Sequence, residues 1–356
     1  MKQFYPLIVV SRTQETRDSV RIGLDVPEEL REEFAFLPGQ HLPIQIEQDG
    51  KRLRRTYSIC SAEGCWPLEI GVRVQAGGRF SEYAAKDLQV GDTLDVMPPT
   101  GRFHLPVDRE EGKFHIAFAA GSGITPILSI VASVLRGEPT SRFALFYGNR
   151  KQDTTMFIEE LFALKNQYPY RFQIHFIFSQ EEQEFDISEG RINADKVAEL
   201  HASFCSGDLV DEAWICGPDS MIETVTEALL ETGLNADAVH AERFGVPRKG
   251  TASEEPTVAA GTNAVAVTVI MDGHKKSFNM PRTGTNIVDA AAEQGLELPY
   301  SCKGGVCATC RTHVREGEVD MATNYGLEPW EVEKGFVLAC QSTPVTEEIV
   351  LDYDKL

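Results

Sequence analysis

Tyr300-Ser301-Cys302-Lys303-Gly304-Gly305-Val306-Cys307-Ala308-Thr309-Cys310 is the stretch that decides most about the C-terminal part of this chain. Its three cysteines are spaced Cys-x4-Cys-x2-Cys, and a fourth follows after a 29-residue gap, which gives the set Cys302, Cys307, Cys310 and Cys340. This is the plant-type ligand pattern of a [2Fe–2S] cluster, in which one tight loop supplies three thiolates and a distant strand supplies the fourth. Gly304 and Gly305 can adopt the positive φ angles that turn backbone N–H groups toward the sulfides. The spacing therefore predicts a centre that moves one electron at a time.

A zinc site is the alternative, since four thiolates also suit tetrahedral Zn²⁺. Zinc sites usually pair their ligands in two short Cys-x2-Cys knuckles, whereas this sequence has one, at Cys307 and Cys310. The pattern therefore favours an iron–sulfur cluster, and with it a redox role, over structural zinc.

The composition is typical of a globular protein with several domains. The 356 residues suffice for two or three domains, and 42% of them are hydrophobic. We expect no signal peptide, because no basic segment followed by a cleavable apolar run opens the sequence. The most apolar stretch, 114–135, is interrupted by Gly121, Gly123 and Pro126, so it predicts strand, turn and helix and not a membrane span. Four further cysteines show no disulfide framework: Cys60, Cys65, Cys205 and Cys216. A reducing cytoplasm is the expected setting.

The formal net charge of −20 is unevenly spread. Residues 1–108 carry a net −3, residues 109–245 a net −11 and residues 265–356 a net −6. An acidic surface argues against nucleic acid as a partner. It is compatible with steering toward a protein that has a basic docking patch, and equally with solubility alone.

The hydrophobic pattern divides the chain into three domains and a linker. Short alternating strands come first and predict an antiparallel β-barrel. Buried strands then alternate with helical stretches, which predicts a parallel α/β sheet. A hairpin turning at Asp272-Gly273, a helix near 287–294 and the cysteine loop predict a small α+β domain of the β-grasp type. A preceding segment rich in small and polar residues is predicted to be a linker, either a hinge or a passive tether. The predicted ranges are 1–108, 109–245, 246–264 for the linker, and 265–356.

Two motifs in the predicted barrel suit a nucleotide with a flat ring system. Arg55-Thr56-Tyr57-Ser58 ends a strand. A guanidinium can bind pyrophosphate with two hydrogen bonds, a tyrosine ring can cover a heterocycle, and a hydroxyl can reach a ring nitrogen. Gly77-Gly78-Arg79-Phe80-Ser81 could present backbone N–H groups to a phosphate at a helix N-terminus, although a plain loop before a helix is the alternative.

Two further motifs lie in the predicted α/β sheet. Ala120-Gly121-Ser122-Gly123-Ile124-Thr125-Pro126 joins a hydrophobic strand to an apolar helix, where glycines allow close approach to a phosphate. It differs from the Rossmann fingerprint, in which a third glycine would fall at Pro126, and a β–α turn without ligand is the alternative. Cys216-Gly217-Pro218 ends a later strand, at the edge where such sheets bind ligands. A buried structural cysteine would give the same pattern.

Taken together, Arg-x-Tyr-Ser, Gly-Gly-x-x-Ser, Gly-x-Gly-x-Thr-Pro and Cys-Gly-Pro resemble the ferredoxin–NADP⁺ reductase family in order and spacing. Glu242-Arg243-Phe244 stands where that family closes its flavin site, and a plant-type ferredoxin follows. The resemblance covers essentially the whole chain. It implies that FAD is bound by Arg55, Tyr57, Ser58, Val72, Val74, Gly78, Ser81 and Phe244. It implies that the nicotinamide dinucleotide is bound by Gly121, Gly123 and Thr125. It also implies a catalytic set of Ser58 near the flavin N5, Cys216 beside the nicotinamide, and Glu242.

A ferredoxin in last position is typical of reductase subunits of multicomponent oxygenases. Three stretches are similar to those in reductase subunits of phenylacetyl-CoA epoxidases: Leu53 to Cys60, Thr323 to Pro329, and Val337 to Gln341. The resemblance implies electron transfer from NADPH through FAD and the [2Fe–2S] cluster to a diiron oxygenase. The alternatives are an aromatic-ring or steroid hydroxylase as partner, a non-catalytic redox sensor or carrier, and a flavin reductase with a vestigial ferredoxin.

A preference for NADPH over NADH requires cations or hydroxyls near the 2′-phosphate. Ser179, after the strand 172–178, and Arg191 are the candidates. Related reductases often have an arginine just after that serine, where this chain has Gln180. Ser179 and Arg191 are the grounds on which NADPH is expected, whereas Gln180 in place of that arginine makes NADH the alternative.

Overall fold

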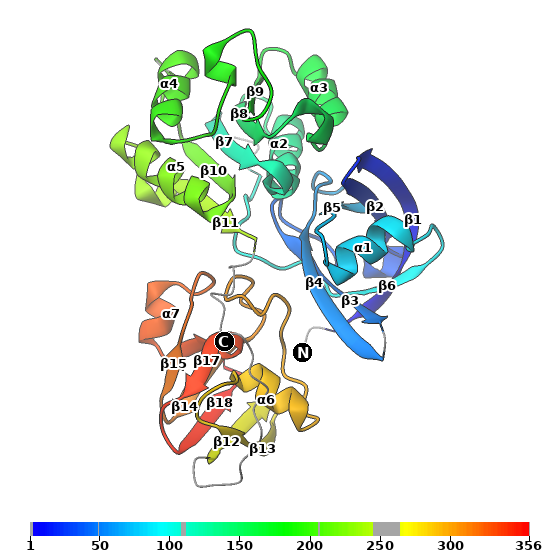
Figure 1. The fold of residues 1–356 in the computed structure, drawn as a ribbon, viewed down its shortest axis with the longest axis vertical. Helices are drawn as coiled ribbons and strands as arrows, with labels where there is room; N and C mark the ends of the chain where they lie inside the picture. The colour runs from blue at the N-terminus through cyan, green and yellow to red at the C-terminus, as the bar shows by residue number, and fades with distance from the viewer. Residues whose placement is uncertain (1–2, 49, 108–111, 206, 245–263, 356) are drawn as a thin grey trace. The chain divides into compact units, whose positions relative to one another are not determined.

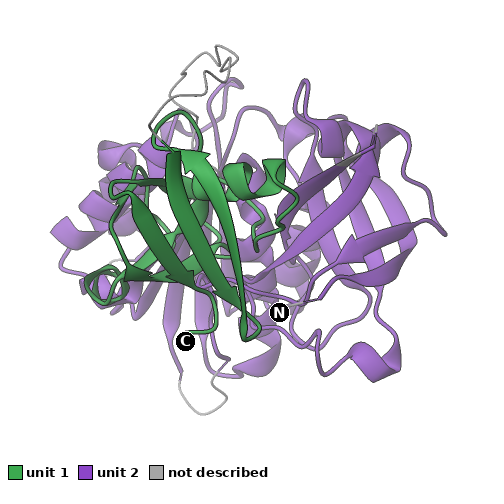
Figure 2. Ribbon diagram, turned by 90° about the horizontal axis from the view of Figure 1, so that it is seen from below, with its two compact units in different colours: residues 1, 245–356 green, residues 2–244 purple. Residues whose placement is uncertain are grey.

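The structure is a computed structural model that describes residues 3–48, 50–107, 112–205, 207–244 and 264–355 (Figure 1). They fall into two compact units, within 2–244 and within 245–356 (Figure 2). The predicted linker 246–264 lies outside the described residues except for Ala264, which is the first residue of a strand. No helix in the described part of the chain is long and apolar enough to cross a membrane.

The first half of the larger unit is an antiparallel barrel. Its elements are β1 (Tyr5–Thr16), β2 (Ser19–Asp25), β3 (His41–Gln48), β4 (Lys51–Ser58), β5 (Leu68–Arg73), α1 (Arg79–Lys86) and β6 (Thr93–Val96). The strand order is β4-β3-β6-β1-β2-β5, and a bridge between Ile59 and Ile70 joins the two ends. Alternate residues of β5, such as Ile70 and Val72, are buried in the barrel core because successive side chains of a strand point to opposite faces.

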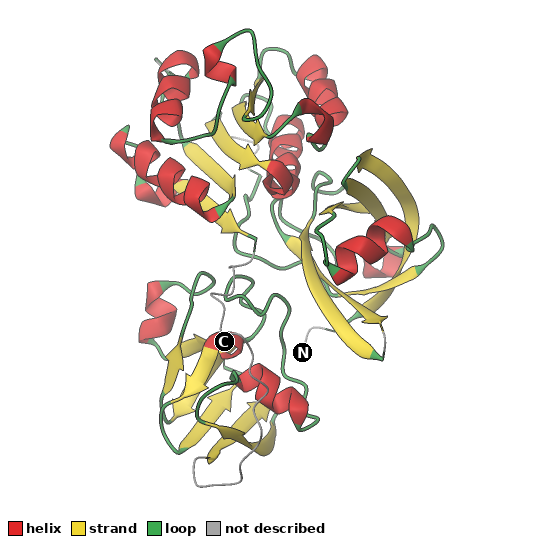
Figure 3. Ribbon diagram, viewed as in Figure 1, coloured by secondary structure: helices red, strands yellow, loops and turns green. Residues whose placement is uncertain are grey.

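The second half of the larger unit is a parallel sheet with helices on both faces (Figure 3). Its strands are β7 (Phe114–Ala120), β8 (Arg142–Asn149), β9 (Phe172–Phe178), β10 (Glu212–Gly217) and β11 (Val239–Arg243). Its helices are α2 (Ile124–Gly137), α3 (Ile158–Gln167), α4 (Ala194–Phe204) and α5 (Asp219–Glu231). The strand order is β11-β10-β7-β8-β9. Residues of α2 and α3 belong to the core on one face, and residues of α4 and α5 to the core on the other.

Helix α2 begins at Ile124, directly after the glycine turn. Pro126 is therefore inside its first turn, where the missing N–H of proline costs nothing because first-turn donors have no intrahelical acceptor. The turn Gly121–Gly123 is a short 3₁₀ helix that leads directly from β7 into α2. The glycine motif is thus held rigidly between a buried strand and a buried helix.

The barrel and the parallel sheet meet through Phe157 and Arg21. Phe157 is fully buried with a left-handed φ of 59°, and its N–H donates to Glu15 Oε1 at 2.8 Å. The guanidinium of Arg21 lies 4.7 Å from the Phe157 ring centroid and pairs with Glu160 of α3. These contacts fix the orientation of the sheet on the barrel. A site built from residues of both the barrel and the sheet requires this fixed orientation.

The smaller unit is an α+β fold. Its elements are β12 (Ala264–Met271), β13 (His274–Pro281), α6 (Ile287–Glu293), β14 (Arg311–Glu316), β15 (Val319–Met321), α7 (Pro329–Glu333), β16 (Phe336–Leu338), β17 (Ser342–Pro344) and β18 (Glu348–Asp352). The main sheet has the order β13-β12-β18-β14-β16, with β12 and β18 parallel, and β15 pairs with β17. The predicted hairpin turns at Asp272 and Gly273, whose φ angles of 52° and 72° suit a tight two-residue turn. Cys310 directly precedes β14, and Cys340 lies two residues after the end of β16. Because β14 and β16 are paired in the sheet, they position these two cysteines.

Candidate functional site

Strand β4 carries the predicted Arg-x-Tyr-Ser motif at its end. Arg55 is exposed, whereas the Tyr57 ring is half-buried, with its centroid 5.0 Å from that of Phe80. Burial raises the pKa of the Tyr57 hydroxyl, so this side chain stays neutral. Ser58 is buried, and its Oγ has no hydrogen-bond partner among the described residues. A buried hydroxyl in this state is suited to a bound group that can complete its hydrogen bond.

The glycine pair before α1 is shaped by close contacts. A Cβ on Gly78 would lie 2.4 Å from Ser81 Oγ and 2.9 Å from the carbonyl oxygen of Gln75, so no larger residue fits. Ser81 Oγ donates to the Gly78 carbonyl at 3.0 Å, and Gly77 takes a left-handed φ of 75°. The motif therefore forms a compact turn at the start of α1.

The two valines beside Arg73 occupy different environments. Val72 is fully buried in the barrel core, so at most its main chain could meet a cofactor, while Val74 is half-buried. Arg73 points toward the parallel sheet, where its Nη2 donates to the Thr154 carbonyl at 2.8 Å.

The glycine turn after β7 lies against the end of β10. A Cβ on Gly123 would lie 2.1 Å from the carbonyl oxygen of Cys216 and 2.9 Å from the nitrogen of Gly217. Gly121 has a left-handed φ of 54°, and its carbonyl accepts the Tyr147 hydroxyl at 2.9 Å. Thr125 Oγ1 donates to the Ser122 carbonyl at 3.1 Å. The structure thus brings the predicted Gly-x-Gly-x-Thr-Pro and Cys-Gly-Pro motifs into direct backbone contact.

A row of buried polar groups connects the barrel with the sheet. His41 pairs with Ser58 across β3 and β4, and its Nδ1 lies 3.5 Å from Glu242 Oε1. Glu242 pairs with Cys216 across β11 and β10. All four side chains are buried, and three of their atoms have no hydrogen-bond partner among the described residues: Ser58 Oγ, His41 Nε2 and Glu242 Oε2. The predicted catalytic set Ser58, Cys216 and Glu242 is therefore contiguous, and His41 joins it.

Sequence reasoning missed His41. It lies in no recognised motif, and a single histidine in a barrel strand is an ordinary core residue. Only the β3–β4 register places it opposite Ser58, and only the junction with β11 places it beside Glu242.

Burial dominates the electrostatics of this row. Burial raises the pKa of Glu242, and the neighbouring His41 opposes part of that shift. Burial, and then the nearby Glu242 carboxylate, raise the pKa of the Cys216 thiol. Both shifts favour the neutral, protonated forms of these groups over their charged forms.

The two candidates for the 2′-phosphate each follow one of two paired backbone segments. Gly190 donates its N–H to the Phe178 carbonyl at 2.9 Å, and these are the residues directly before Arg191 and Ser179. Arg191 is exposed, and Ser179 Oγ donates to the Asn149 carbonyl at 3.3 Å. Phe244, the last described residue of this unit, is 45% exposed.

The four cysteines of the smaller unit come together as two pairs. The backbone N–H groups of Cys302 and Cys307 each donate to the other residue's Sγ at 3.4 Å. Cys310 and Cys340 shift each other's pKa, which places their side chains together. In the described part of the chain, no three metal-ligand side chains surround a single ion position. Two sulfur pairs match a binuclear cluster, in which each iron takes two protein thiolates. All eight cysteines are free thiols and lie within the described residues.

Backbone N–H groups converge on these sulfurs. Cys302 Sγ accepts from Gly304 N at 3.3 Å and from Cys307 N at 3.4 Å, and Thr309 Oγ1 lies 3.2 Å from Cys307 Sγ. The adjacent Cys307 side chain, together with the backbone donors, lowers the pKa of Cys302 and favours its thiolate. Donors that stabilise negative sulfur suit the thiolates and sulfides of an iron–sulfur cluster.

Of the two glycines expected to adopt positive φ angles, Gly305 does and Gly304 does not. Two non-glycine residues of the loop are left-handed instead. Gly305 has a φ of 77°, and the non-glycine residues Lys303 and Ala308 have φ angles of 52° and 51°. Non-glycine residues in this region carry a steric cost of about 1–2 kcal/mol. A strained loop with inward N–H groups is typical of a functional site.

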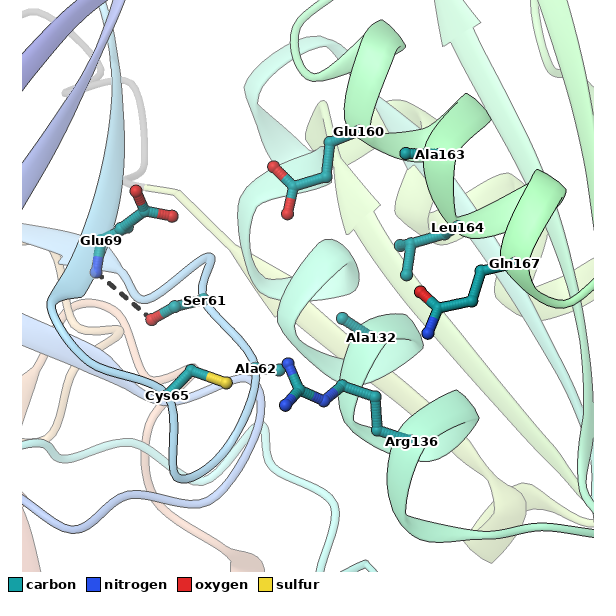
Figure 4. Close-up of a pocket in the computed structure, with 10 residues that line it drawn as sticks. All are labelled: Ser61, Ala62, Cys65, Glu69, Ala132, Arg136, Glu160, Ala163, Leu164 and Gln167. Carbon is teal, nitrogen blue, oxygen red and sulfur yellow. Dashed lines mark hydrogen bonds between the residues drawn. The ribbon is translucent and has the colours of Figure 1, made fainter.

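A cavity of 480 Å³ opens between the barrel and helices α2 and α3 (Figure 4). Cys65 and Glu69 lie on its barrel side, while Arg136 of α2 and Glu160 of α3 face them. None of the predicted site residues lines it, so this cavity is separate from the buried polar row.

Comparison with known families assigns a domain type to each part of the chain. Residues 6–105 match the oxidoreductase FAD-binding domain, residues 118–227 the oxidoreductase NAD-binding domain, and residues 269–345 the 2Fe-2S iron-sulfur cluster binding domain. These matches support FAD, pyridine nucleotide and [2Fe–2S] binding.

Whole-chain relatives combine the same parts. The chain is 44% identical to a component of the 1,2-phenylacetyl-CoA epoxidase of Escherichia coli (strain K12), over 99% of each chain. It is 34% identical to the ferredoxin reductase component of 3-ketosteroid-9-alpha-monooxygenase of Rhodococcus rhodochrous, over 98% of this chain and 96% of that protein. Among solved structures, phthalate dioxygenase reductase matches with a TM-score of 0.62 and 26% identity, over 98% of each chain. The chain therefore belongs to the family of oxygenase reductase components, oxidoreductases with FAD-binding, NAD-binding and 2Fe-2S domains in this order.

Proposed function

We propose that this chain is the reductase of a multicomponent diiron oxygenase that epoxidises phenylacetyl-CoA, and that it draws its electrons from NADPH. The observation that carries the proposal is the 44% identity over 99% of the chain to a protein named as a component of such an epoxidase. A bound FAD would supply the link between the two-electron chemistry of the nicotinamide and the one-electron chemistry of the cluster. The proposed setting is the cytoplasm, where thiols outside the cluster, such as Cys60, Cys65, Cys205 and Cys216, persist.

In the proposed flavin site, β4 and α1 hold the cofactor. Arg55 pairs with its pyrophosphate, helped by the turn at Gly78 and Ser81, and Tyr57 covers the flavin ring. Val74, Phe244 and the main chain at Val72 line the remaining surface. The orphaned Ser58 Oγ supplies a hydrogen bond to the ring, which removes the cost of its burial without a partner.

In the proposed nucleotide site, Gly121, Gly123 and Thr125 receive the pyrophosphate at the start of α2. Cys216 lies beside the nicotinamide, because Gly123 holds the carboxyl end of β10 in backbone contact with this turn. Ser179 and Arg191 bind the 2′-phosphate. Glu242, whose pKa burial raises, is the proposed hydrogen-bond donor toward the ring system in its protonated form, and His41 positions it through the 3.5 Å contact between them.

In the proposed cluster site, Cys302 and Cys307 bind one iron, and Cys310 and Cys340 the other. The three domains are proposed to span 1–108, 109–245 and 265–356, and the matched family ranges fall within these limits. The linker 246–264 would let the cluster domain visit first the flavin and then the oxygenase.

Reconstitution with candidate oxygenases tests the proposal. Purified protein, NADPH and the oxygenase subunits of a phenylacetyl-CoA epoxidase should form epoxide, with NADPH consumed in step. A second candidate, a steroid hydroxylase, is favoured by the 34% identity to a ketosteroid monooxygenase reductase. Epoxide formation with the first oxygenase and no product with the second would support the proposal, whereas the reverse would exclude it.

A further inference from the structure

Gln341 follows Cys340 directly, and its side-chain amide lies among acceptors from both halves of the cysteine site. Its Nε2 is 2.8 Å from the carbonyl oxygen of Lys303 and 3.0 Å from that of Cys340. The same nitrogen is 3.7 Å from Cys340 Sγ. These two carbonyl oxygens fix the orientation of the side-chain amide. If the amide were flipped, its Oε1 would face two other acceptors, and neither hydrogen bond could form.

The amide joins parts of the chain that are far apart in sequence. Lys303 lies between Cys302 and Cys307, which form one sulfur pair, whereas Cys340 belongs to the other. The loop also packs closely on this side chain, since a Cβ on Gly305 would lie 3.1 Å from Gln341 Cγ. One side chain therefore links the two pairs that a binuclear cluster must hold at a fixed separation.

The amide is also a donor aimed at a sulfur. Gln341 is half-buried, so water screens its dipole only in part. Reduction adds negative charge to the cluster and its thiolates, and a hydrogen bond to a ligand sulfur stabilises that charge. An N–H group near Cys340 Sγ should therefore make reduction more favourable.

We propose that Gln341 is a positioning residue that holds the two cysteine pairs together and raises the reduction potential of the cluster through Cys340. The inference rests on the proposed ligation by the four cysteines. The inference concerns the reduction potential. If Gln341 acted through packing alone, the potentials of its variants would not depend on the charge of the substituted side chain.

Three substitutions in the full-length holoprotein separate the donor from the packing. Gln341→Met keeps the length and removes the N–H group, Gln341→Glu keeps the shape and adds negative charge, and Gln341→Lys keeps a donor. Gln294→Met is the matched control, because Gln294 is an exposed glutamine of the same unit that donates to the Asn279 carbonyl. The reduction potential is measured by anaerobic redox titration, followed through cluster absorption and electron paramagnetic resonance.

Gln341→Met should lower the equilibrium constant for cluster reduction about three- to tenfold, which is about 30 to 60 mV for one electron. Gln341→Glu should lower it further, while Gln341→Lys and Gln294→Met should not lower it. If Gln341→Met and Gln341→Glu titrate at the wild-type potential, the inference is wrong although the proposed function stands.

A variant that loses its cluster has no reduction potential to measure. Iron content and cluster absorption are therefore measured for every variant, and the pattern of cluster loss then tests the inference. Loss in the Met and Glu variants with retention in the Lys variant supports the bridging donor. Loss in all three variants, including the Lys variant that keeps a donor, contradicts the inference, as does loss in the Met and Lys variants with retention in the shape-preserving Glu variant. A wild-type protein without [2Fe–2S] absorption contradicts the proposed ligand set itself.

Discussion

Gly123→Ala should slow hydride transfer while leaving both redox centres in place. The added Cβ would lie 2.1 Å from the Cys216 carbonyl oxygen, whereas real Cβ atoms essentially never approach closer than 3.0 Å. The turn and β10 must therefore separate by at least 0.9 Å, the difference between these distances. Both clashing groups are backbone, so no change of rotamer relieves the contact. In the proposed site, this separation moves the turn that binds the nucleotide pyrophosphate away from Cys216, which lies beside the nicotinamide.

A misplacement of about 1 Å can cost roughly 10²-fold in rate, which is about 2.7 kcal/mol in activation free energy. Stopped-flow mixing with NADPH under anaerobic conditions measures flavin reduction directly, while absorption gives the FAD and cluster content. Gly137→Ala is the control, because its Cβ meets a methyl group of Val107 at the other end of α2. Wild-type rates of flavin reduction in Gly123→Ala would refute the proposed contact between nucleotide and turn.

Three further predictions concern the nucleotide, the cluster and the buried carboxyl. Arg191→Ala should raise KM for NADPH about tenfold or more, through loss of a charge-assisted hydrogen bond, with little effect for NADH. Equal effects on both nucleotides, measured by steady-state kinetics beside Arg142→Ala, would remove Arg191 from the 2′-phosphate site. Cys340→Ser should abolish the cluster and cytochrome c reduction but leave FAD bound and NADPH–ferricyanide activity largely intact, and simultaneous loss of FAD would contradict independent domains. Because burial raises the pKa of Glu242, its stabilising contribution is present below the ordinary carboxyl pKa and is lost as pH rises through the raised one. Denaturant unfolding should therefore show Glu242→Gln gaining stability over the wild type as pH increases, and a constant difference would contradict a raised pKa.

The fold was predictable because its signals are local. Each part of the chain has a periodicity of its own, and the turn at Asp272-Gly273 and the strand–turn–helix around Gly121 depend on neighbours in sequence. The cysteine spacing likewise carries the cluster prediction within one loop and one distant residue.

The remainder of the candidate site depends on contacts between distant segments. His41 reaches Ser58 only through the pairing of β3 with β4, and Glu242 only where the barrel meets β11. The left-handed angles of Lys303 and Ala308 are likewise set by the folded loop and not by their residue type. Gln341 shows the same limit, since its partner Lys303 lies 38 residues earlier in the chain.

The central claim is that one polypeptide carries electrons from a pyridine nucleotide to an iron–sulfur cluster. An ultraviolet–visible spectrum of the purified protein, followed by anaerobic titration with NADPH, tests it most directly. We predict that flavin and [2Fe–2S] absorption are both present and that NADPH bleaches both. Bleaching of the flavin alone, with the cluster silent or absent, would contradict the claim and leave a plain flavin reductase.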